Sequence, residues 1–280
     1  MQKILCPIDF SPTALNALEY AVKLGEGLHA TLTLLYVLSE EEFNKVLVDK
    51  ESSFEDWKEQ EEARLCALCD EINAVSQKKG LVKADYMIKV GELTEGVSSL
   101  AKADHYKLIV MGTGGASDLK KVYWGSNTIK VVNKSNIPVL CIPHTAKFAG
   151  FRKVVYATNY DKHDKEAIAE LVTLSVPFDS IVQVVHVFAE ATVEKKKIHH
   201  DFSEEMKSFV GYHKLRFAEV QGEDRVSLVL DEYMKTENGE VLSLMTIQRG
   251  FFENLFHQSV TKDISGFTHY PLLIFRKGEN

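Results

Sequence analysis

The sequence has few cysteines, no surplus of positive charge and no long hydrophobic run. Its four cysteines all lie within residues 1–149 and show no pattern of a disulfide framework, which favours a reduced cytoplasmic compartment. Lys and Arg number 33 against 40 Asp and Glu, giving a net charge of −7, so the basic footprint of a nucleic-acid-binding protein is missing. No apolar run approaches the roughly 18 residues of a membrane span, and the opening residues lack the plan of a signal peptide. We therefore expect a cytoplasmic protein that binds neither nucleic acid nor membranes.

Common catalytic motifs are also missing. The sequence contains no G-x-S-x-G, no Walker A and no H-E-x-x-H motif, and no nucleophile–base pair can be assigned from it. Cys66 and Cys69 have C-x-x-C spacing, but they lie inside an amphipathic helical pattern with no second cysteine pair, so packed or partly exposed thiols are favoured over zinc or redox chemistry. His199 and His200 follow three lysines, which is typical of a solvated segment rather than a metal site.

The sequence does contain an internal repeat. Residues 34–40 (LLYVLSE) are echoed by residues 184–190 (VVHVFAE) at an offset of 150, and residues 137–142 (IPVLCI) by residues 270–275 (YPLLIF) at an offset of 133. A repeat of this length in 280 residues predicts two domains of one kind. We place the boundary near Gly150, which gives domains 1–149 and 150–280.

Within the first copy, apolar strand-like runs alternate with helical patterns. Ser11 followed by Pro12 predicts a helix start, and Gly25 or Gly27 is expected to end that helix. Ser52 and Glu55 form a candidate capping box that opens a long helix. Continuously apolar strands between helices indicate a parallel sheet covered on both faces. We expect strands at residues 2–8, 31–38, 83–90, 107–111 and 139–142, with helices at 12–25, 52–80, 94–103 and 126–134.

The strongest functional signal follows the fourth expected strand. There the sequence reads G-x2-G-x9-G-S, from Gly112 through Gly115 to Gly125 and Ser126. Glycines leave room for backbone N–H groups to approach a ligand, and a helix start presents unpaired N–H groups and the positive end of the helix dipole. The pattern predicts an anion cradle suited to phosphates.

The other half of this site is expected at the end of the first strand. Ligands of open α/β sheets lie beyond the carboxyl ends of the strands, where the strand order reverses. Asp9 follows the first strand, and its carboxylate suits ribose hydroxyls or a divalent cation. Val37, at the end of the second strand, offers backbone groups and an apolar wall to a base. A plain helix-entry cap remains the alternative for Asp9, because Ser11 and Pro12 follow at once.

At these residues the chain resembles the universal stress protein family in its tandem form. The matching pieces are the opening residues 4–11 (ILCPIDFS), Tyr36-Val37, the entry Met111-Gly112-Thr113, the glycine spacing and the closing residues 137–139. The resemblance implies an α/β fold of two Rossmann-like, adenine nucleotide alpha hydrolase-like domains, each with a five-stranded parallel sheet in the order 3-2-1-4-5. It also implies an ATP or AMP site in the cleft. The Asp9 carboxylate is the candidate ligand for an Mg²⁺ ion, which the hydrolase alternative would need. By the same resemblance the nucleotide-binding residues are Pro7, Ile8, Asp9, Val37, Met111, Gly112, Gly115, Gly125, Ser126 and Asn127.

Two features depart from the family pattern in the first copy. Ala116 and Asp118 stand where relatives often have a basic residue and a glycine. A carboxylate at position 118 repels a triphosphate unless a metal, Lys120 or Lys121 offsets it. This departure leaves the choice between ATP and AMP open.

The second copy departs much further. Thr246 and Gln258 replace the first and third motif glycines, Asn159 stands where the first copy has Asp9, and bulky Phe251 and Phe252 occupy the loop. Side chains with a Cβ prevent the same close approach to a phosphate. We expect the second domain not to bind nucleotide in this way.

The leading hypothesis is therefore a stress-response or signalling protein that binds an adenine nucleotide in its first domain. A slow ATP hydrolase or phosphotransferase at the same site, and a nucleotide-free scaffold, are the alternatives. The last strands, 139–142 and 272–275, are expected to pair as an internal pseudo-dimer. A protein partner and a homodimer stay open.

Overall fold

The computed structural model describes residues 2–48, 53–77, 83–103, 106–114, 125–190, 192–222, 225–246 and 269–276. The chain divides into two compact units, Met1–Lys147 and Phe148–Asn280. The division falls close to Gly150, where the repeat places the domain boundary.

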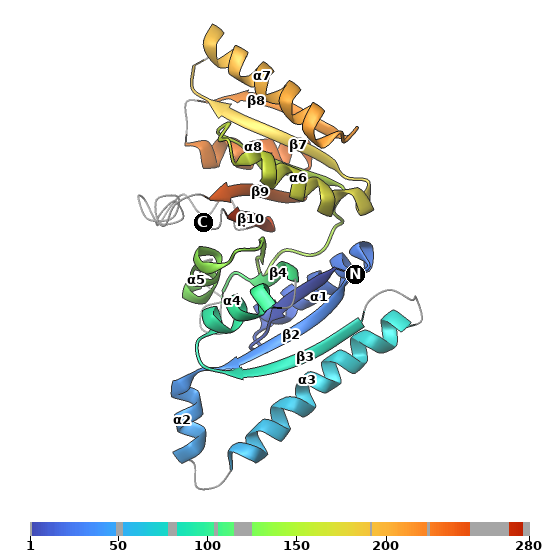
Figure 1. The fold of residues 1–280 in the computed structure, drawn as a ribbon, viewed down its shortest axis with the longest axis vertical. Coiled ribbons are helices and arrows are strands. Elements are labelled where there is room, and N and C mark those ends of the chain that lie inside the picture. Colours follow the sequence, from blue (N-terminus) through green and yellow to red (C-terminus); the bar gives the residue numbers. More distant parts are fainter. Residues whose placement is uncertain are drawn as a thin grey trace. The chain divides into compact units, whose positions relative to one another are not determined.

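The N-terminal unit alternates strands and helices along the chain (Figure 1). The described elements are β1 (Lys3–Pro7), α1 (Pro12–Leu28), β2 (Thr31–Leu38), α2 (Glu40–Val48), α3 (Phe54–Gln77), β3 (Lys83–Val90), α4 (Leu93–Ala103), β4 (Tyr106–Gly112), α5 (Ser126–Lys134) and β5 (Val139–Ile142). All neighbouring strands run parallel, in the order β3-β2-β1-β4-β5. The expected α/β fold and strand order are confirmed.

The C-terminal unit repeats this plan. Its described elements are β6 (Lys153–Ala157), α6 (Asp164–Ser175), the short 3-10 helix η1 (Val176–Phe178), β7 (Ile181–Phe188), α7 (Val193–Val210), β8 (Leu215–Gln221), α8 (Val226–Glu237), β9 (Val241–Thr246) and β10 (Leu272–Arg276). The strands are again parallel, in the order β8-β7-β6-β9-β10. Each unit therefore has its first strand at the centre of its sheet. The pairing expected between residues 139–142 and 272–275 stays a prediction.

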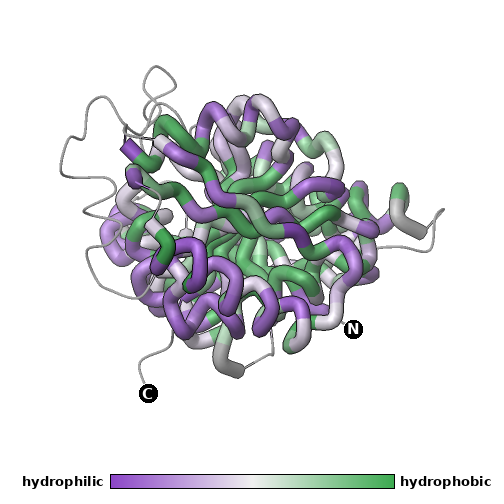
Figure 2. The backbone as a smooth tube through the Cα atoms, turned by 90° about the horizontal axis from the view of Figure 1, so that it is seen from above, coloured by the Kyte–Doolittle hydropathy of each residue, from purple (hydrophilic) through white to green (hydrophobic). Residues whose placement is uncertain are grey.

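Helices cover the N-terminal sheet. Helix α1 packs against β1, β4 and β5, α3 packs against β3, and α4 and α5 pack against each other. Strands buried under helices should be apolar along their whole length, and residues 4–8 of β1 and the following turn are all buried. Figure 2 shows hydrophobic stretches concentrated in the interior and hydrophilic ones on the outer helices.

The first helix is longer than the sequence predicts. It passes both Gly25 and Gly27 and ends at Leu28, followed by His29 in the left-handed conformation at φ 50°. The His29 N–H bonds back to the carbonyls of Glu26 and Gly25, so this residue makes the helix cap that glycine usually makes.

The segment after β2 also differs from expectation. Helix α2 was not predicted, although Ser39 and Glu42 bond reciprocally as a capping box: the Glu42 N–H donates to Ser39 Oγ, and the Ser39 N–H to Glu42 Oε2. Ser53 and Asp56 make the equivalent box at the start of α3. Ser52, the predicted cap, lies outside the described residues.

The buried face of α3 is narrower than its apolar pattern predicts. Glu61, Leu65 and Cys69 are its buried residues, whereas Val75 is 51% exposed. The helix lies over the edge strand β3, so only its central turns find a partner surface.

Candidate functional site

The strand order of the N-terminal unit places its switch point between β1 and β4. The chain moves from β1 outward through β2 to β3, then returns to β4 on the other side of β1. The loops that leave β1 and β4 therefore diverge and leave a crevice at the carboxyl ends of the strands.

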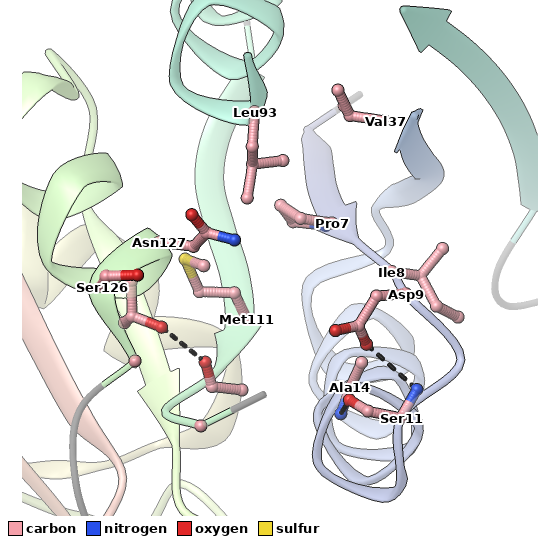
Figure 3. Close-up of a pocket in the computed structure, with 14 residues that line it drawn as sticks. Pro7, Ile8, Asp9, Ser11, Ala14, Val37, Leu93, Met111, Ser126 and Asn127 are labelled. Atoms are coloured by element: carbon pink, nitrogen blue, oxygen red, sulfur yellow. Dashed lines mark hydrogen bonds between the residues drawn. The ribbon is translucent and has the colours of Figure 1, made fainter. Parts of the chain in front are cut away.

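A pocket of about 350 Å³ lies in this crevice. This volume is within the range of small-molecule sites. Figure 3 shows Asp9 and Ser11 on one side of the pocket and Ser126 and Asn127 on the other. The lining residues are Pro7, Ile8, Asp9, Ser11, Ala14, Val37, Leu93, Met111, Gly112, Gly114, Gly125, Ser126, Asn127 and Thr128.

Nine of the ten residues that the sequence nominates line this one pocket. They come from three strand ends and one helix start, which the chain separates by more than one hundred residues. The tenth, Gly115, lies outside the described residues. So do Ala116, Asp118, Lys120 and Lys121.

Sequence reasoning missed several lining residues. Ser11 and Ala14 belong to the start of α1, Leu93 opens α4, and Thr128 lies in the first turn of α5. Each of these residues lies in the turn or the first helical turn after a strand that ends at the crevice. That position in the chain is the feature from which they could have been predicted. Leu93 adds an apolar wall that no motif marks.

The start of α1 has its own hydrogen-bond acceptors. The Ser11 side chain accepts the Ala14 N–H at 3.2 Å, and Asp9 Oδ1 accepts the Ser11 N–H at 3.0 Å. The helix-entry role considered for Asp9 is therefore present, and within the part of the chain that the structure describes it uses one carboxylate oxygen. The other oxygen, on an exposed residue lining the pocket, remains for a ligand.

The start of α5 is different, because its N-cap is Gly125. A glycine has no side chain with which to cap the first N–H groups of the helix. The Gly125 N–H itself donates to the Thr113 carbonyl at 2.5 Å, and Thr128 Oγ1 donates to the Gly112 carbonyl at 2.9 Å. Helix α5 is thus fixed to the end of β4 with its N-terminus towards the pocket, which suits an anion.

Gly112 is required by packing as well as by any ligand. A Cβ at this position would lie 2.7 Å from Thr13 Cγ2 and 2.9 Å from the Thr13 carbonyl oxygen. The end of β4 therefore approaches the first turn of α1 more closely than any side chain permits. This contact brings the two halves of the pocket together.

The charges of the pocket give it a direction. Among the described residues that line it, Asp9 is the one charged side chain. A phosphate is repelled from the carboxylate and attracted to the start of α5. None of the described residues form a group of three or more His, Cys, Asp or Glu that could hold a metal ion.

The equivalent region of the C-terminal unit is built from different groups. Asp164 stands 150 residues after Ala14, and its carboxylate accepts Tyr156 Oη at 2.7 Å, Thr158 Oγ1 at 2.6 Å and the Asp161 N–H at 3.1 Å. Burial raises the pKa of Asp164 above its ordinary value, against these three hydrogen bonds, which lower it. The expected loop residues Phe251, Phe252 and Gln258 lie outside the described residues.

The cysteines are all free thiols. Burial raises the pKa of Cys6 to about 12 and that of Cys141 well above its usual value, so neither thiol ionises near neutral pH. Cys66 is exposed, and the Asp70 carboxylate beside it raises its pKa. Burial also raises the pKa of Cys69 to about 12, so neither thiol of the C-x-x-C pair has the lowered pKa of a redox site.

We expect iodoacetamide to modify Cys66 faster than the other three cysteines in the native protein. Because the Asp70 charge suppresses the Cys66 thiolate, Asp70→Asn should increase the rate severalfold at pH 8. Peptide mapping by mass spectrometry measures both. Equal labelling of Cys66 and Cys141 in the folded protein would contradict this account.

A sequence model of the universal stress protein family matches residues 1–143. The chain belongs to this family. A universal stress protein of Methanocaldococcus jannaschii is 33% identical over 153 residues, covering 50% of this chain and 94% of the relative. The match therefore spans nearly all of that relative but half of this universal stress protein.

Solved universal stress proteins share the fold of the whole chain. The crystal structure of one from Archaeoglobus fulgidus covers 99% of this chain and 98% of its own, with a TM-score of 0.77 and 18% identity. A universal stress protein in complex with cAMP is 20% identical and covers 50% of this chain and 96% of its own, with a TM-score of 0.37. Across the described residues of the present universal stress protein, no helix is long and apolar enough to span a bilayer.

Proposed function

We propose that the N-terminal unit binds one adenine nucleotide, ATP or AMP, and acts as a nucleotide-responsive module in stress response or signalling. The observation that carries this proposal is that the two sides of the pocket differ in charge. One side has the Asp9 carboxylate, and the other has the start of α5 at Gly125, which no side chain caps. The apolar Val37 and Leu93 supply walls for a base. Base and ribose then lie towards Asp9, and phosphates lie towards Ser126 and Asn127.

Binding, rather than catalysis, fits the groups present. The described lining contains no Lys, Arg or His to serve as a transition-state cation or general base. The Asp9 carboxylate would hold an Mg²⁺ ion, because this ion prefers carboxylate oxygens, and the ion would offset the negative charge of the nucleotide.

We further propose that the C-terminal unit does not bind nucleotide in the same way. Its helix α6 begins at Asp164, and Asp161 lies three residues before it, where the first unit has Ala14 and Ser11. The Asp161 carboxylate accepts the His163 N–H at 2.8 Å, so the start of α6 already has a negative partner. Thr246, which replaces Gly112, is buried at 2% exposure.

Isothermal calorimetry with ATP and with AMP, each with and without Mg²⁺, tests the proposal. We expect saturable binding of one nucleotide per chain. Asp9→Ala should weaken it about tenfold, the effect of losing one charged hydrogen bond. Gly125→Val should weaken it further, because the side chain fills the start of α5. The matched control is Asn159→Ala, the equivalent change in the C-terminal unit, which should leave affinity unchanged.

Two further measurements separate the alternatives. Mass spectrometry of small molecules released from the denatured protein should find an adenine nucleotide. Multiple turnovers of ATP that Asp9→Ala abolishes would assign an enzyme instead. No heat at millimolar nucleotide, or two sites per chain, would contradict the proposal.

A further inference from the structure

Phe10 has an unusual backbone conformation. It is the middle residue of the turn formed by residues 9–11, which we call the Asp9 turn. Its φ is 57°, in the left-handed region that bulky side chains avoid because their Cβ crowds the following carbonyl. The hydrogen bond from the Ser11 N–H to Asp9 Oδ1 spans this residue. The conformation of Phe10 therefore decides where the Asp9 carboxylate lies.

Helix α3 supplies a cation to the Phe10 ring. The Arg64 guanidinium carbon lies 3.8 Å from the ring centroid, well within the range of a cation–π contact. Glu61, one turn earlier, accepts from Arg64 Nη1 through both carboxylate oxygens, at 2.8 and 3.0 Å. Because Glu61 is 9% exposed, this nearly buried carboxylate holds the guanidinium in place.

Tyr36 completes the contacts of the Phe10 ring. Its centroid lies 5.8 Å from that of Phe10, and the Trp57 ring lies 6.1 Å from that of Tyr36. Tyr36 directly precedes the pocket residue Val37. The ring thus joins the base end of the pocket to α3.

In the C-terminal unit, Tyr160 is the residue equivalent to Phe10, and other side chains contact its ring. Tyr160, 150 residues after Phe10, has φ 60°. Its ring lies 4.2 Å from that of His186 on β7, the counterpart of Tyr36, and its hydroxyl lies 2.8 Å from His199 Nδ1 on α7. In both copies, a helix between the second and third strands, α3 or α7, contacts the side chain of the left-handed residue. Two different sets of contacts on one strained position indicate that the strain needs a clamp.

We propose that Arg64, held by Glu61, is a positioning residue: it clamps Phe10 in the left-handed conformation and so fixes Asp9 at the nucleotide pocket. The expected effect on nucleotide affinity rests on the proposed function. The expected effect on the conformation of the Asp9 turn does not depend on it. A simpler role, in which Arg64 only neutralises Glu61 within α3, predicts no effect on the Asp9 turn.

The test compares Arg64→Met, Arg64→Lys, Phe10→Gly and the Phe10→Gly/Arg64→Met double variant. Two quantities are measured: hydrogen exchange of the Ser11 amide by NMR in nucleotide-free protein, and ATP affinity by calorimetry. Lys58→Met is the matched control, because it removes a different ion pair of the same helix, Lys58–Glu62.

We expect Arg64→Met to reduce both Ser11 amide protection and ATP affinity about fivefold, the scale of one exposed cation–π contact. Arg64→Lys should restore part of both, because an ammonium also binds the ring. In the Phe10→Gly background, Arg64→Met should have no further effect, since glycine adopts positive φ without a clamp. Lys58→Met should match the unmodified protein.

The outcomes separate the two proposals. Unchanged Ser11 protection in Arg64→Met, or an equal loss with and without Phe10, would overturn the clamp. If the unmodified protein binds no ATP, the proposed function fails, and the exchange data still decide whether Arg64 holds the turn.

Discussion

A Gly112→Ala variant is expected to destabilise the N-terminal unit by about 2 kcal/mol, the usual scale of overpacking a closely packed site. The added Cβ would lie 2.9 Å from the Thr13 carbonyl oxygen and 3.0 Å from its carbonyl carbon. These are backbone atoms at the start of α1, so they cannot rotate away as a flexible side chain can. Urea unfolding followed by tryptophan fluorescence measures the loss, because both tryptophans, Trp57 and Trp124, lie in the N-terminal unit.

Gly96→Ala is the matched control with the opposite expected sign. Gly96 lies inside α4, and a Cβ there would meet Val37 Cγ2 at 3.4 Å, an ordinary contact. Replacing a helical glycine with alanine should increase stability by up to about 1 kcal/mol. If Gly112→Ala were as stable as the unmodified protein, this would contradict the close contact between Gly112 of β4 and Thr13 of α1.

An Asp164→Ala variant is expected to destabilise the C-terminal unit by about 3 kcal/mol. The change removes the acceptor of two buried hydroxyls, those of Tyr156 and Thr158. Tyr156 is fully buried, and burial raises its pKa, so its hydroxyl stays protonated and needs an acceptor. Calorimetric unfolding or circular dichroism in urea would measure the loss.

Adding Tyr156→Phe to Asp164→Ala tests this explanation. The second change removes one of the two orphaned hydroxyls, so the double variant should lose less stability than the sum of the single variants. A strictly additive loss would contradict a shared hydrogen-bond network.

The same carboxyl also predicts a pH dependence. Because burial raises the pKa of Asp164 in the folded state, the folded protein binds more protons than the unfolded chain between the two pKa values. The additional stability that comes from protonating this carboxyl is therefore fully present below the ordinary pKa of about 3.9. It is lost as pH rises through the raised value. Asp164→Asn removes the titration, so the difference in unfolding free energy between it and the unmodified protein should change across this acidic window.

Local sequence signals predicted most of the N-terminal elements. Strand β2 and helix α5 have the expected bounds, because apolar runs and helix starts are local features. The end of α1 was predicted wrongly, since glycine is only one residue that can take the left-handed cap and His29 takes it here. The partner of α3 was also beyond a local pattern, because burial depends on which strand a helix covers.

The candidate site was predicted to a similar extent. The glycine spacing and Asp9 indicated a crevice, because strand ends in a parallel sheet meet at one edge. Leu93 belongs to no motif, and Ser11 was predicted only as a helix start. The place of both residues in the pocket follows from the turns that carry them.

The amino-acid order alone determined the two-copy organisation, the parallel α/β class and the family, because repeats, periodicity and motif spacing are properties of the linear sequence. Only the tertiary structure revealed that Thr13 forbids a side chain at Gly112, that Arg64 lies over Phe10, and that Asp164 collects buried hydroxyls. Each of these is a contact whose distance depends on how helices pack on the sheet, and packing joins residues that no local pattern connects.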